Sequence, residues 1–201
     1  FSFEDNTTPK PEEILDKRGI FDDYNGKCNY QITTGVVGNF DTEGWGVIKY
    51  TNLTSTGEPG QDVLWVDTDF PLFRLGDVYL MYAEAVARGG EGGDINTAVG
   101  YVNELRDRAY GETPHNKIDA AWLTANNYQN ILDERGRELY WEGVRRIDLI
   151  RFGKYTSSSY TWPAKGGVIT GVGVNERYNI FPIPISDISV NGSLEQNEGY
   201  K

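Results

Sequence analysis

The chain has 201 residues, a length that suits one domain with a sizeable core, and its formal net charge is −11. This acidic balance argues against a nucleic acid or an anionic membrane surface as partner, because either needs a basic face that neutralises phosphates. The sequence holds one cysteine, Cys28, and one histidine, His115. These counts exclude an internal disulfide, a Cys/His zinc site and a histidine-based triad, and we expect Cys28 to be a buried, idle thiol.

The first third of the chain reads mainly as loops. Residues 9–19 predict a short helix with acidic residues in its first turn, ended by Gly19. Residues 21–70 are rich in Gly, Asn, Asp and Thr, which favours loops with a few short strands. The β-prone runs are residues 30–37, 46–53 and 62–66.

The middle of the chain is strongly helical. Residues 73–90 carry apolar side chains at helical spacing and stop at two glycines. Residues 93–111 repeat the pattern, with Asp94 as N-cap and Gly111 as the stop. Two helices joined by a tight glycine turn form an α-hairpin, a pairing like that of tetratricopeptide proteins, although no clean 34-residue repeat is present.

A third helix is predicted over residues 126–143, with Asn126 and Gln129 at capping-box spacing and Gly143 at its end. The following residues, 144–155, continue as a short helix or a turn. Residues 153–179 read as a Gly/Ser-rich loop. In residues 181–188, two prolines favour an extended backbone, which its apolar neighbours predict to be buried.

A column of carboxylates is the most conspicuous feature of the third helix. Glu134, Glu138 and Glu142 lie four residues apart, so on a helix they share one face and repel one another. Acid–base catalysis by Glu138 and Glu142, metal binding and a structural ion-pair network are the three interpretations. One straight helix cannot easily place two acids on opposite sides of a sugar. Basic residues three and four positions away favour the network, as in the expected local pair Glu134–Arg137. The expected counter-charges are Arg145, Arg146 and Arg151.

Aromatic residues in glycine-rich loops are the candidate ligand contacts. A sugar packs its C–H face on an aromatic plane and offers its hydroxyls to polar side chains. Tyr160, Trp162 and Trp45 lie in such loops, whereas Trp122 and Trp141 lie in or near helical pattern and are expected in the core. No cofactor is expected. Residues 41–44 and 89–94 offer acidic oxygens for a structural Ca²⁺, but neither matches a D-x-D-x-D-G loop, and glycine turns explain them better.

Three segments together resemble the SusD/RagB family of outer-membrane glycan-binding lipoproteins. They are "DTDFPLFRLGDVYLMYAEA" (67–85), "ILDERGRELYWEGVRRIDLIRFGKY" (131–155) and "FPIPISDISVNGSLEQNEGY" (181–200). The order and spacing of the segments also fit. The last segment has Gly192 and Glu198 where family members often have proline. The resemblance identifies residues 1–201 as a single domain, the C-terminal region of a longer protein whose N-terminal part is absent.

The resemblance implies a mainly α fold: an α/α superhelix of tetratricopeptide-like helix pairs, with long loops and a few short strands. It also implies a cell-surface protein that is not an enzyme and has no catalytic residues. Such a protein binds an oligosaccharide, with α-glucan of the starch type as first expectation, and delivers it to a SusC-type TonB-dependent transporter. It is held at the outer membrane by a lipid anchor outside this chain.

Two other functions stay open at this point. One is a glycoside hydrolase that uses Glu138 and Glu142. The other is a pure interaction module that binds the transporter and has no ligand site of its own.

Overall fold

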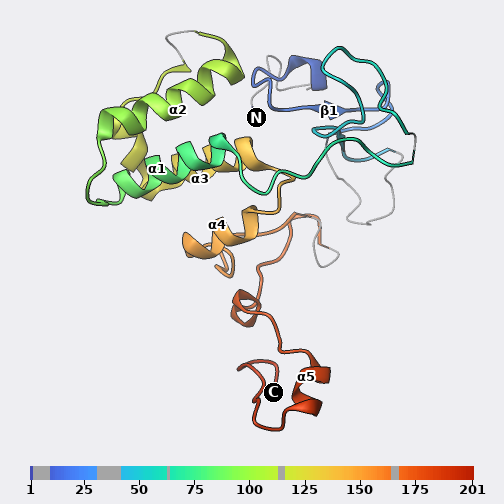
Figure 1. Cartoon of the computed structure of the whole chain (residues 1–201), viewed down its shortest axis with the longest axis vertical. Coiled ribbons are helices and arrows are strands. Elements are labelled where there is room, and N and C mark those ends of the chain that lie inside the picture. Colours follow the sequence, from blue (N-terminus) through green and yellow to red (C-terminus); the bar gives the residue numbers. More distant parts are fainter. Residues whose placement is uncertain (2–9, 31–41, 63, 113–115, 164–167) are drawn as a thin grey trace. The chain divides into compact units, whose positions relative to one another are not determined.

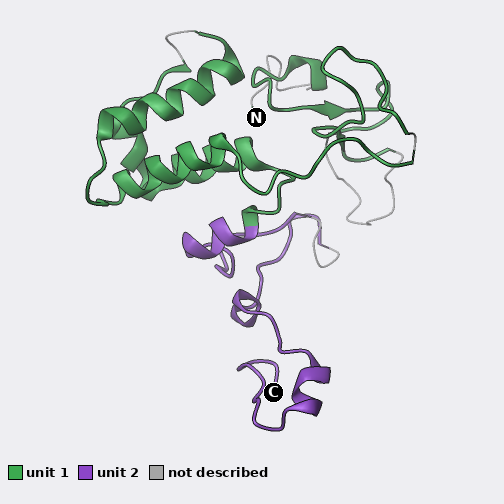
Figure 2. Ribbon diagram, in the orientation of Figure 1, with its two compact units in different colours: residues 1–31, 40–145 green, residues 32–39, 146–201 purple. Residues whose placement is uncertain are grey.

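The computed structural model describes residues 1, 10–30, 42–62, 64–112, 116–163 and 168–201. These residues form a mainly helical fold with a few short strands, as Figure 1 shows. The chain divides into two compact units (Figure 2). Unit 1 comprises residues 1–31 and 40–145, and unit 2 comprises residues 32–39 and 146–201.

The predicted helical hairpin is confirmed in unit 1. Helix α1 runs over Leu75–Ala87 and helix α2 over Ile95–Tyr110. Between them, Gly89 adopts a φ of 86°, a left-handed backbone that glycine takes without strain. Asp94 caps α2 as expected, since its side chain accepts a hydrogen bond from the Thr97 amide at 2.7 Å.

Helix α3 spans Ala120–Leu139, and its N-cap is Asp119 rather than Asn126. The helix is interrupted at Ala125–Tyr128, where three consecutive residues have a positive φ. Asn126, at φ 52°, therefore lies inside the break and does not form the predicted capping box. The Asn130 side chain donates to the Trp122 carbonyl at 3.0 Å, which links the two helical pieces. The helix ends at Tyr140, its C-cap, before Gly143.

The core of unit 1 lies where α1 packs against both α2 and α3. Each helix contributes small or branched apolar side chains at helical spacing, so the three helices approach closely. Trp122 packs against this core, as predicted, and Cys28 is also buried. The buried cluster is Leu80, Ala83, Ala98, Val102, Leu105, Ile118, Leu123 and Ile131.

The N-terminal segment has less regular structure than expected. Only Pro11–Glu13 forms a helical turn, of the 3₁₀ type, in place of the helix predicted over 9–19. After the turn, the Lys17 amide donates to the Ala109 carbonyl at the end of α2, at 2.9 Å. This contact docks the segment against α2. It also brings Arg18, which bonds Asp16, to the carboxylates of Glu134 and Glu138 on α3.

A two-stranded antiparallel sheet is the one sheet among the described residues. Strand β1, Phe21–Asp22, pairs with β2, Gly46–Val47, and Phe21 is opposite Val47. The strand predicted over 46–53 is therefore confirmed only at its start. The described residues of 62–66 form no strand, and the run at 30–37 lies outside the described residues after Tyr30.

Unit 2 contains helix α4, Arg145–Arg151, which begins at the last residue of unit 1, a 3₁₀ turn over Glu176–Asn179, and helix α5, Ile185–Val190. Of the two alternatives left open for residues 144–155, a short helix or a turn, the structure has the short helix. Trp162 and Val172 form an isolated antiparallel bridge within the glycine-rich loop.

The last residues of the chain bind the proline segment through side chains. Gln196 accepts from the Ile183 amide at 2.8 Å and donates to the Ile183 carbonyl at 2.9 Å. Asn197 donates to the Phe181 carbonyl at 2.8 Å, and the Tyr200 hydroxyl donates to the Ile180 carbonyl at 3.1 Å. A proline-containing strand cannot form a full backbone ladder, because proline lacks an N–H, so these side chains take the place of a neighbouring strand.

The prediction that residues 181–188 are buried and extended throughout is wrong for this chain. Pro184 has an extended backbone, but α5 begins directly after it. Phe181 is 71% exposed and Ile185 is 76% exposed. The apolar residues of this segment are therefore not core residues of unit 2.

No helix in the described part of the chain combines the length and apolar character needed to cross a bilayer.

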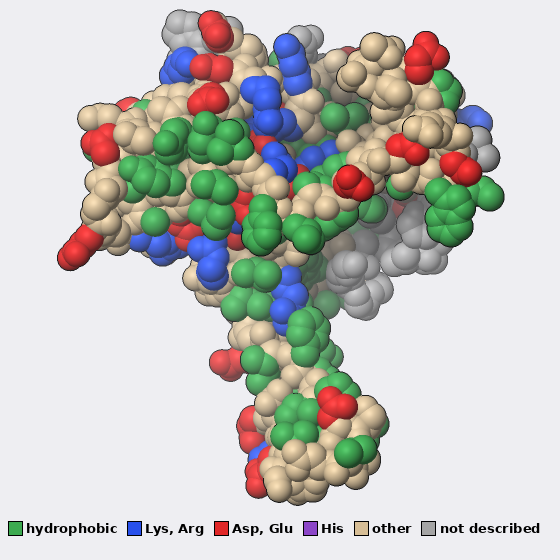
Figure 3. Space-filling model, viewed as in Figure 1, with side chains coloured by type: hydrophobic (Ala, Val, Ile, Leu, Met, Phe, Trp, Pro, Cys, Tyr) green, Lys and Arg blue, Asp and Glu red, His purple; other side chains and the backbone are tan. Residues whose placement is uncertain are grey.

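Hydrophobic side chains gather over the helices of unit 1 on the face in Figure 3. On α1, the exposed apolar side chains are Leu75, Val78 and Met81.

Candidate functional site

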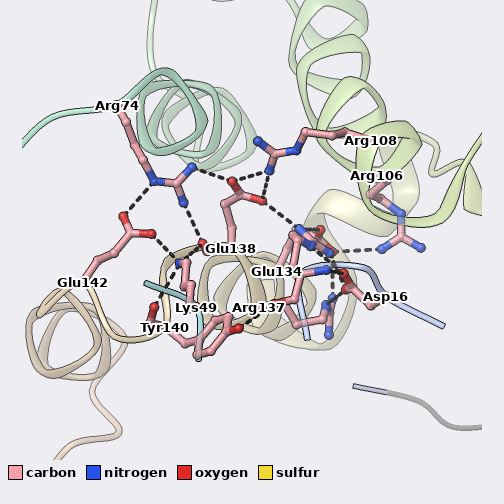
Figure 4. Close-up of polar contacts among 11 residues, drawn as sticks. Asp16, Lys49, Arg74, Arg106, Arg108, Glu134, Arg137, Glu138, Tyr140 and Glu142 are labelled. Carbon is pink, nitrogen blue, oxygen red and sulfur yellow. Dashed lines mark hydrogen bonds and ion pairs between the residues drawn. The ribbon is translucent and has the colours of Figure 1, made fainter. Parts of the chain in front are cut away.

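The three glutamates of the column lie at the centre of a buried ion-pair network in unit 1 (Figure 4). Glu134 and Glu138 come from α3, and Glu142 follows three residues after its end. The cations come from the N-terminal segment, the strand loops, the start of α1, helix α2 and α3 itself. They are Arg18, Lys49, Arg74, Arg106, Arg108 and Arg137.

Glu138 is the most heavily bonded carboxylate of the network. It accepts from Arg108 at 2.6 Å, from Arg74 at 2.7 Å and from Arg18 at 3.0 Å. Burial disfavours its charged form, but the hydrogen bonds from Arg108, Arg74 and Arg18 outweigh burial and lower the pKa of Glu138 to about 2. Its carboxylate therefore stays ionised throughout the physiological pH range.

Glu134 and Glu142 are held in the same way. Glu134, which is fully buried, bonds Arg137 at 2.7 Å, Arg18 at 2.8 Å and Arg106 at 2.9 Å. Burial opposes its charge, but the positive charge of Arg18 and Arg137 prevails and lowers its pKa. Lys49 and Arg74 likewise lower the pKa of Glu142 against the effect of burial.

The structure corrects the expected counter-charges. Arg145 donates to the Leu132 carbonyl at 2.8 Å, and Arg146 donates to the Tyr178 carbonyl at 2.6 Å. Arg151 pairs with Asp148. Of the expected local pairs, Glu134–Arg137 is confirmed, since it needs only helical spacing.

The other partners of the glutamates were missed because they are distant in sequence. Arg18 lies 120 positions from Glu138, and Arg74 lies 64 positions from it. The signal that was available is Arg74 itself. It lies at the N-terminal end of a predicted helix, where the helix dipole favours anions rather than cations. Spacing alone does not connect it to a carboxylate.

This network is unsuited to acid–base catalysis. A general acid needs a pKa raised towards the working pH, whereas all three glutamates have lowered pKa values. Arg74 bonds both Glu138 and Glu142, so the positions that a sugar would need between them are taken by a guanidinium. The arrangement instead ties five segments of unit 1 together.

A cavity of about 430 Å³ opens onto the outer side of the network. Figure 3 shows basic side chains gathered in a hollow beside the helices. Most hydrogen-bond donors of Lys49, Arg74 and Arg18 are already used by carboxylates and carbonyls of the network. The cavity is lined by Lys17, Arg18, Ile20, Lys49, Tyr50, Pro71, Arg74, Arg108, Glu138 and Glu142.

A second cavity, of about 340 Å³, lies beside Trp141 and shares Tyr50 with the first. Trp141 is 68% exposed, so the prediction that it belongs to the core is wrong. The physical reason is its backbone, which has a φ of 63° and directs Trp141 outwards between two inward-facing neighbours. The cavity is lined by Tyr50, Thr51, Val66, Thr68, Asp69, Phe70 and Trp141.

The predicted ligand contacts lie in two separate aromatic clusters. In unit 2, Trp162 is half-buried and meets Tyr160 edge to face, with ring centroids 5.3 Å apart, and Tyr155 at 6.0 Å. In unit 1, Trp45 packs against Phe21 and Tyr30, and its indole N–H donates to the Cys28 carbonyl at 3.2 Å.

Of the two segments considered for Ca²⁺, the structure describes residues 89–94 in full and residues 41–44 in part. In 89–94, Asp94 serves as the cap of α2. In 41–44, Asp41 lies outside the described residues. Among the described residues, no group of three or more His, Cys, Asp or Glu side chains has the geometry to hold a metal ion.

Comparison with known proteins agrees with the arrangement of helices and motifs. A model of the SusD family matches residues 20–200. The chain belongs to the SusD family. The starch-binding protein SusD of Bacteroides thetaiotaomicron is 43% identical over 171 residues, which cover 85% of this chain and 28% of that protein. A SusD-like protein of Formosa agariphila is 31% identical over 135 residues, covering 65% of this chain and 24% of that protein.

Solved structures show the same fold. A surface glycan-binding protein A from Bacteroides thetaiotaomicron superposes with a TM-score of 0.58 at 28% identity, over 79% of this chain and 31% of that one. A SusD superfamily protein from Parabacteroides distasonis superposes with a TM-score of 0.60 at 23% identity, over 96% of this chain and 42% of that one. The chain therefore spans less than half the length of these relatives, and its fold is that of the matching part of SusD superfamily proteins.

Proposed function

We propose that this chain is the C-terminal region of a longer protein, and that this protein binds an oligosaccharide without hydrolysing it and passes it to a SusC-type TonB-dependent transporter. The observation that carries the proposal is the 43% identity with starch-binding SusD over 85% of this chain. For this reason α-glucan is the first ligand to test. The proposal places the protein at the cell surface, anchored by a lipid outside these residues.

The ion network supports a binding function over hydrolysis. All three glutamates have lowered pKa values and bond arginines, whereas a hydrolase would need a proton donor at this place. Tyr160, Trp162 and Trp45 remain our proposed ligand contacts. Tyr160 and Trp162 form one edge-to-face pair, which offers the C–H face of a sugar ring two differently oriented aromatic surfaces.

Isothermal titration calorimetry of the full-length protein tests the proposal. The probes are maltoheptaose, a cello-oligosaccharide of similar length and an oligogalacturonide. We expect saturable binding of maltoheptaose with no release of shorter sugars over several hours. Failure of all three sugars to bind would reject the proposal and favour the interaction module, which binds the transporter alone.

The aromatic contacts need a separate variant. Trp162→Ala is expected to weaken maltoheptaose binding by roughly tenfold, the effect of losing about 1.4 kcal/mol at an aromatic contact. Trp65→Ala is the matched control, because Trp65 is 76% exposed and lines neither cavity. Equal affinities of the two variants would remove Trp162 from the site.

A further inference from the structure

The backbone around Trp141 indicates that the surrounding structure holds its exposed ring in a defined position. Tyr140 and Glu142, its two neighbours, both point into unit 1. The Tyr140 hydroxyl donates to the Arg18 carbonyl at 2.5 Å, and the Glu142 carboxylate accepts from Arg74 at 2.7 Å. With both neighbours fixed, Trp141 adopts a φ of 63°, a conformation that is a clear outlier for a bulky side chain. Such backbone persists only where the surrounding structure imposes it, and it is concentrated at functional sites.

The ring of Trp141 forms one wall of the cavity of about 340 Å³, a volume within the range of small-ligand sites, about 300–1,000 Å³. The other apolar surface comes from Tyr50, Val66 and Phe70, which are all exposed. Two segments line the cavity besides Trp141, residues 50–51 and 66–70, and they are linked because the Thr68 hydroxyl donates to the Thr51 carbonyl at 3.4 Å. The cavity thus combines an aromatic plane with a wall of defined position.

The polar residues of this cavity match hydroxyl groups rather than charges. Thr51 and Thr68 supply hydroxyls, and Asp69 supplies a carboxylate for which no hydrogen bond is found among the described residues. Among the described residues that line the cavity there is no lysine or arginine. An anionic ligand would therefore meet a carboxylate without a counter-charge, whereas a neutral polyol can donate its hydroxyl hydrogens to that carboxylate.

We propose that the cavity beside Trp141 is a subsite for a neutral sugar ring, which stacks on the Trp141 indole and donates a hydroxyl hydrogen bond to Asp69. This inference rests on the proposed function and gives it a location in this chain. It also gives the ion network a second role, because the bonds of Tyr140 and Glu142 position the Trp141 backbone.

Four variants of the full-length protein test the subsite by calorimetry with maltoheptaose, the cello-oligosaccharide and the oligogalacturonide. Trp141→Ala is expected to weaken binding of the neutral ligand by about tenfold, as for an aromatic anchor of a binding site. Trp141→Phe keeps a ring and is expected to stay within about threefold of the wild type, since a ring face still remains for stacking. Asp69→Asn is expected to bring in measurable binding of the oligogalacturonide. Trp65→Ala, the exposed control, is expected to bind like the wild type.

The outcomes separate this inference from the proposed function. If the wild type binds a neutral sugar and Trp141→Ala binds it as tightly as Trp65→Ala, the subsite is rejected while the proposed function stands. If Trp141→Ala instead lowers the thermal midpoint well below that of Trp65→Ala with unchanged affinity, the ring packs against protein and the subsite is rejected. Tryptophan-dependent binding of the oligogalacturonide alone would reject the neutral class. If no sugar binds the wild type, both proposals fail.

Discussion

Arg18 and Glu138 lie 120 positions apart in the sequence, and the Arg18 guanidinium donates to the Glu138 carboxylate at 3.0 Å. The same guanidinium also bonds Asp16 at 2.7 Å and Glu134 at 2.8 Å, so one arginine joins the N-terminal segment to α3. Both partners are almost fully buried. A buried charge that loses its partner is costly, and this contact therefore makes the N-terminal segment and α3 mutually dependent.

Glu138→Gln is expected to lower the free energy of unfolding by about 3–5 kcal/mol, because three arginines then face a neutral amide in a buried site. Urea denaturation followed by circular dichroism measures the change. Glu58→Gln, at an exposed turn, is the control and is expected to change stability by less than about 0.5 kcal/mol. Equal stabilities of the two variants would show that the network adds nothing to folding.

Stability is expected to depend on pH in the acid range. The folded pKa of Glu138 is about 2, below the ordinary value of 4.5, and the pKa values of Glu134 and Glu142 are lowered too. A lowered carboxyl pKa contributes stability above the unfolded pKa, and that contribution is lost as pH falls through the folded pKa. The unfolding midpoint in urea should therefore be level from pH 6 to 8 and fall between about pH 4.5 and 2. Glu138→Gln should flatten this fall; an unchanged pH profile in that variant would contradict the assignment.

Gly76 and Gly100 form a matched pair of helical glycines. A Cβ at Gly76 would lie 2.8 Å from Glu138 Oε1 and 2.9 Å from Arg74 Nη1, whereas a Cβ at Gly100 meets nothing within 4 Å. Gly76→Ala is expected to destabilise by about 1–3 kcal/mol through displacement of the network. Gly100→Ala is expected to stabilise by about 0.5–1 kcal/mol, the usual gain of alanine in a helix. Thermal denaturation of both variants tests this, and a gain for both would mean that the Arg74–Glu138 pair moves aside freely.

The C-terminal contacts of unit 2 are open to a local measurement. Gln196→Ala removes both hydrogen bonds to the Ile183 backbone, so the Ile183 amide should exchange with deuterium at least about tenfold faster. Glu195→Ala changes the adjacent, exposed side chain and should leave that exchange rate unaltered. Unchanged protection of Ile183 in Gln196→Ala would mean that another group holds the proline segment.

The sequence by itself determined the helical hairpin and its ends. Apolar spacing located α1 and α2. Asp94 located the start of α2, and Gly89–Gly90 and Gly111 located the ends of the two helices. These rules act between residues three or four positions apart, so the sequence alone was enough. The same local rule found the Glu134–Arg137 pair. The resemblance to the SusD/RagB family singled out residues 181–200, although not the role of their last side chains, which is to bond the carbonyls and the amide of the proline segment.

Only the tertiary structure decided which cations neutralise the carboxylate column. Arg145 lies close in sequence but bonds a carbonyl, whereas Arg18, Arg74 and Arg108 reach Glu138 because chain packing brings their segments to one face of α3. It also decided the direction of Trp141. Periodicity placed that residue in the core, but the fixed neighbours on either side force a left-handed backbone that turns the indole outwards. Periodicity records which residues are apolar, and it carries no information on contacts between segments distant in the chain.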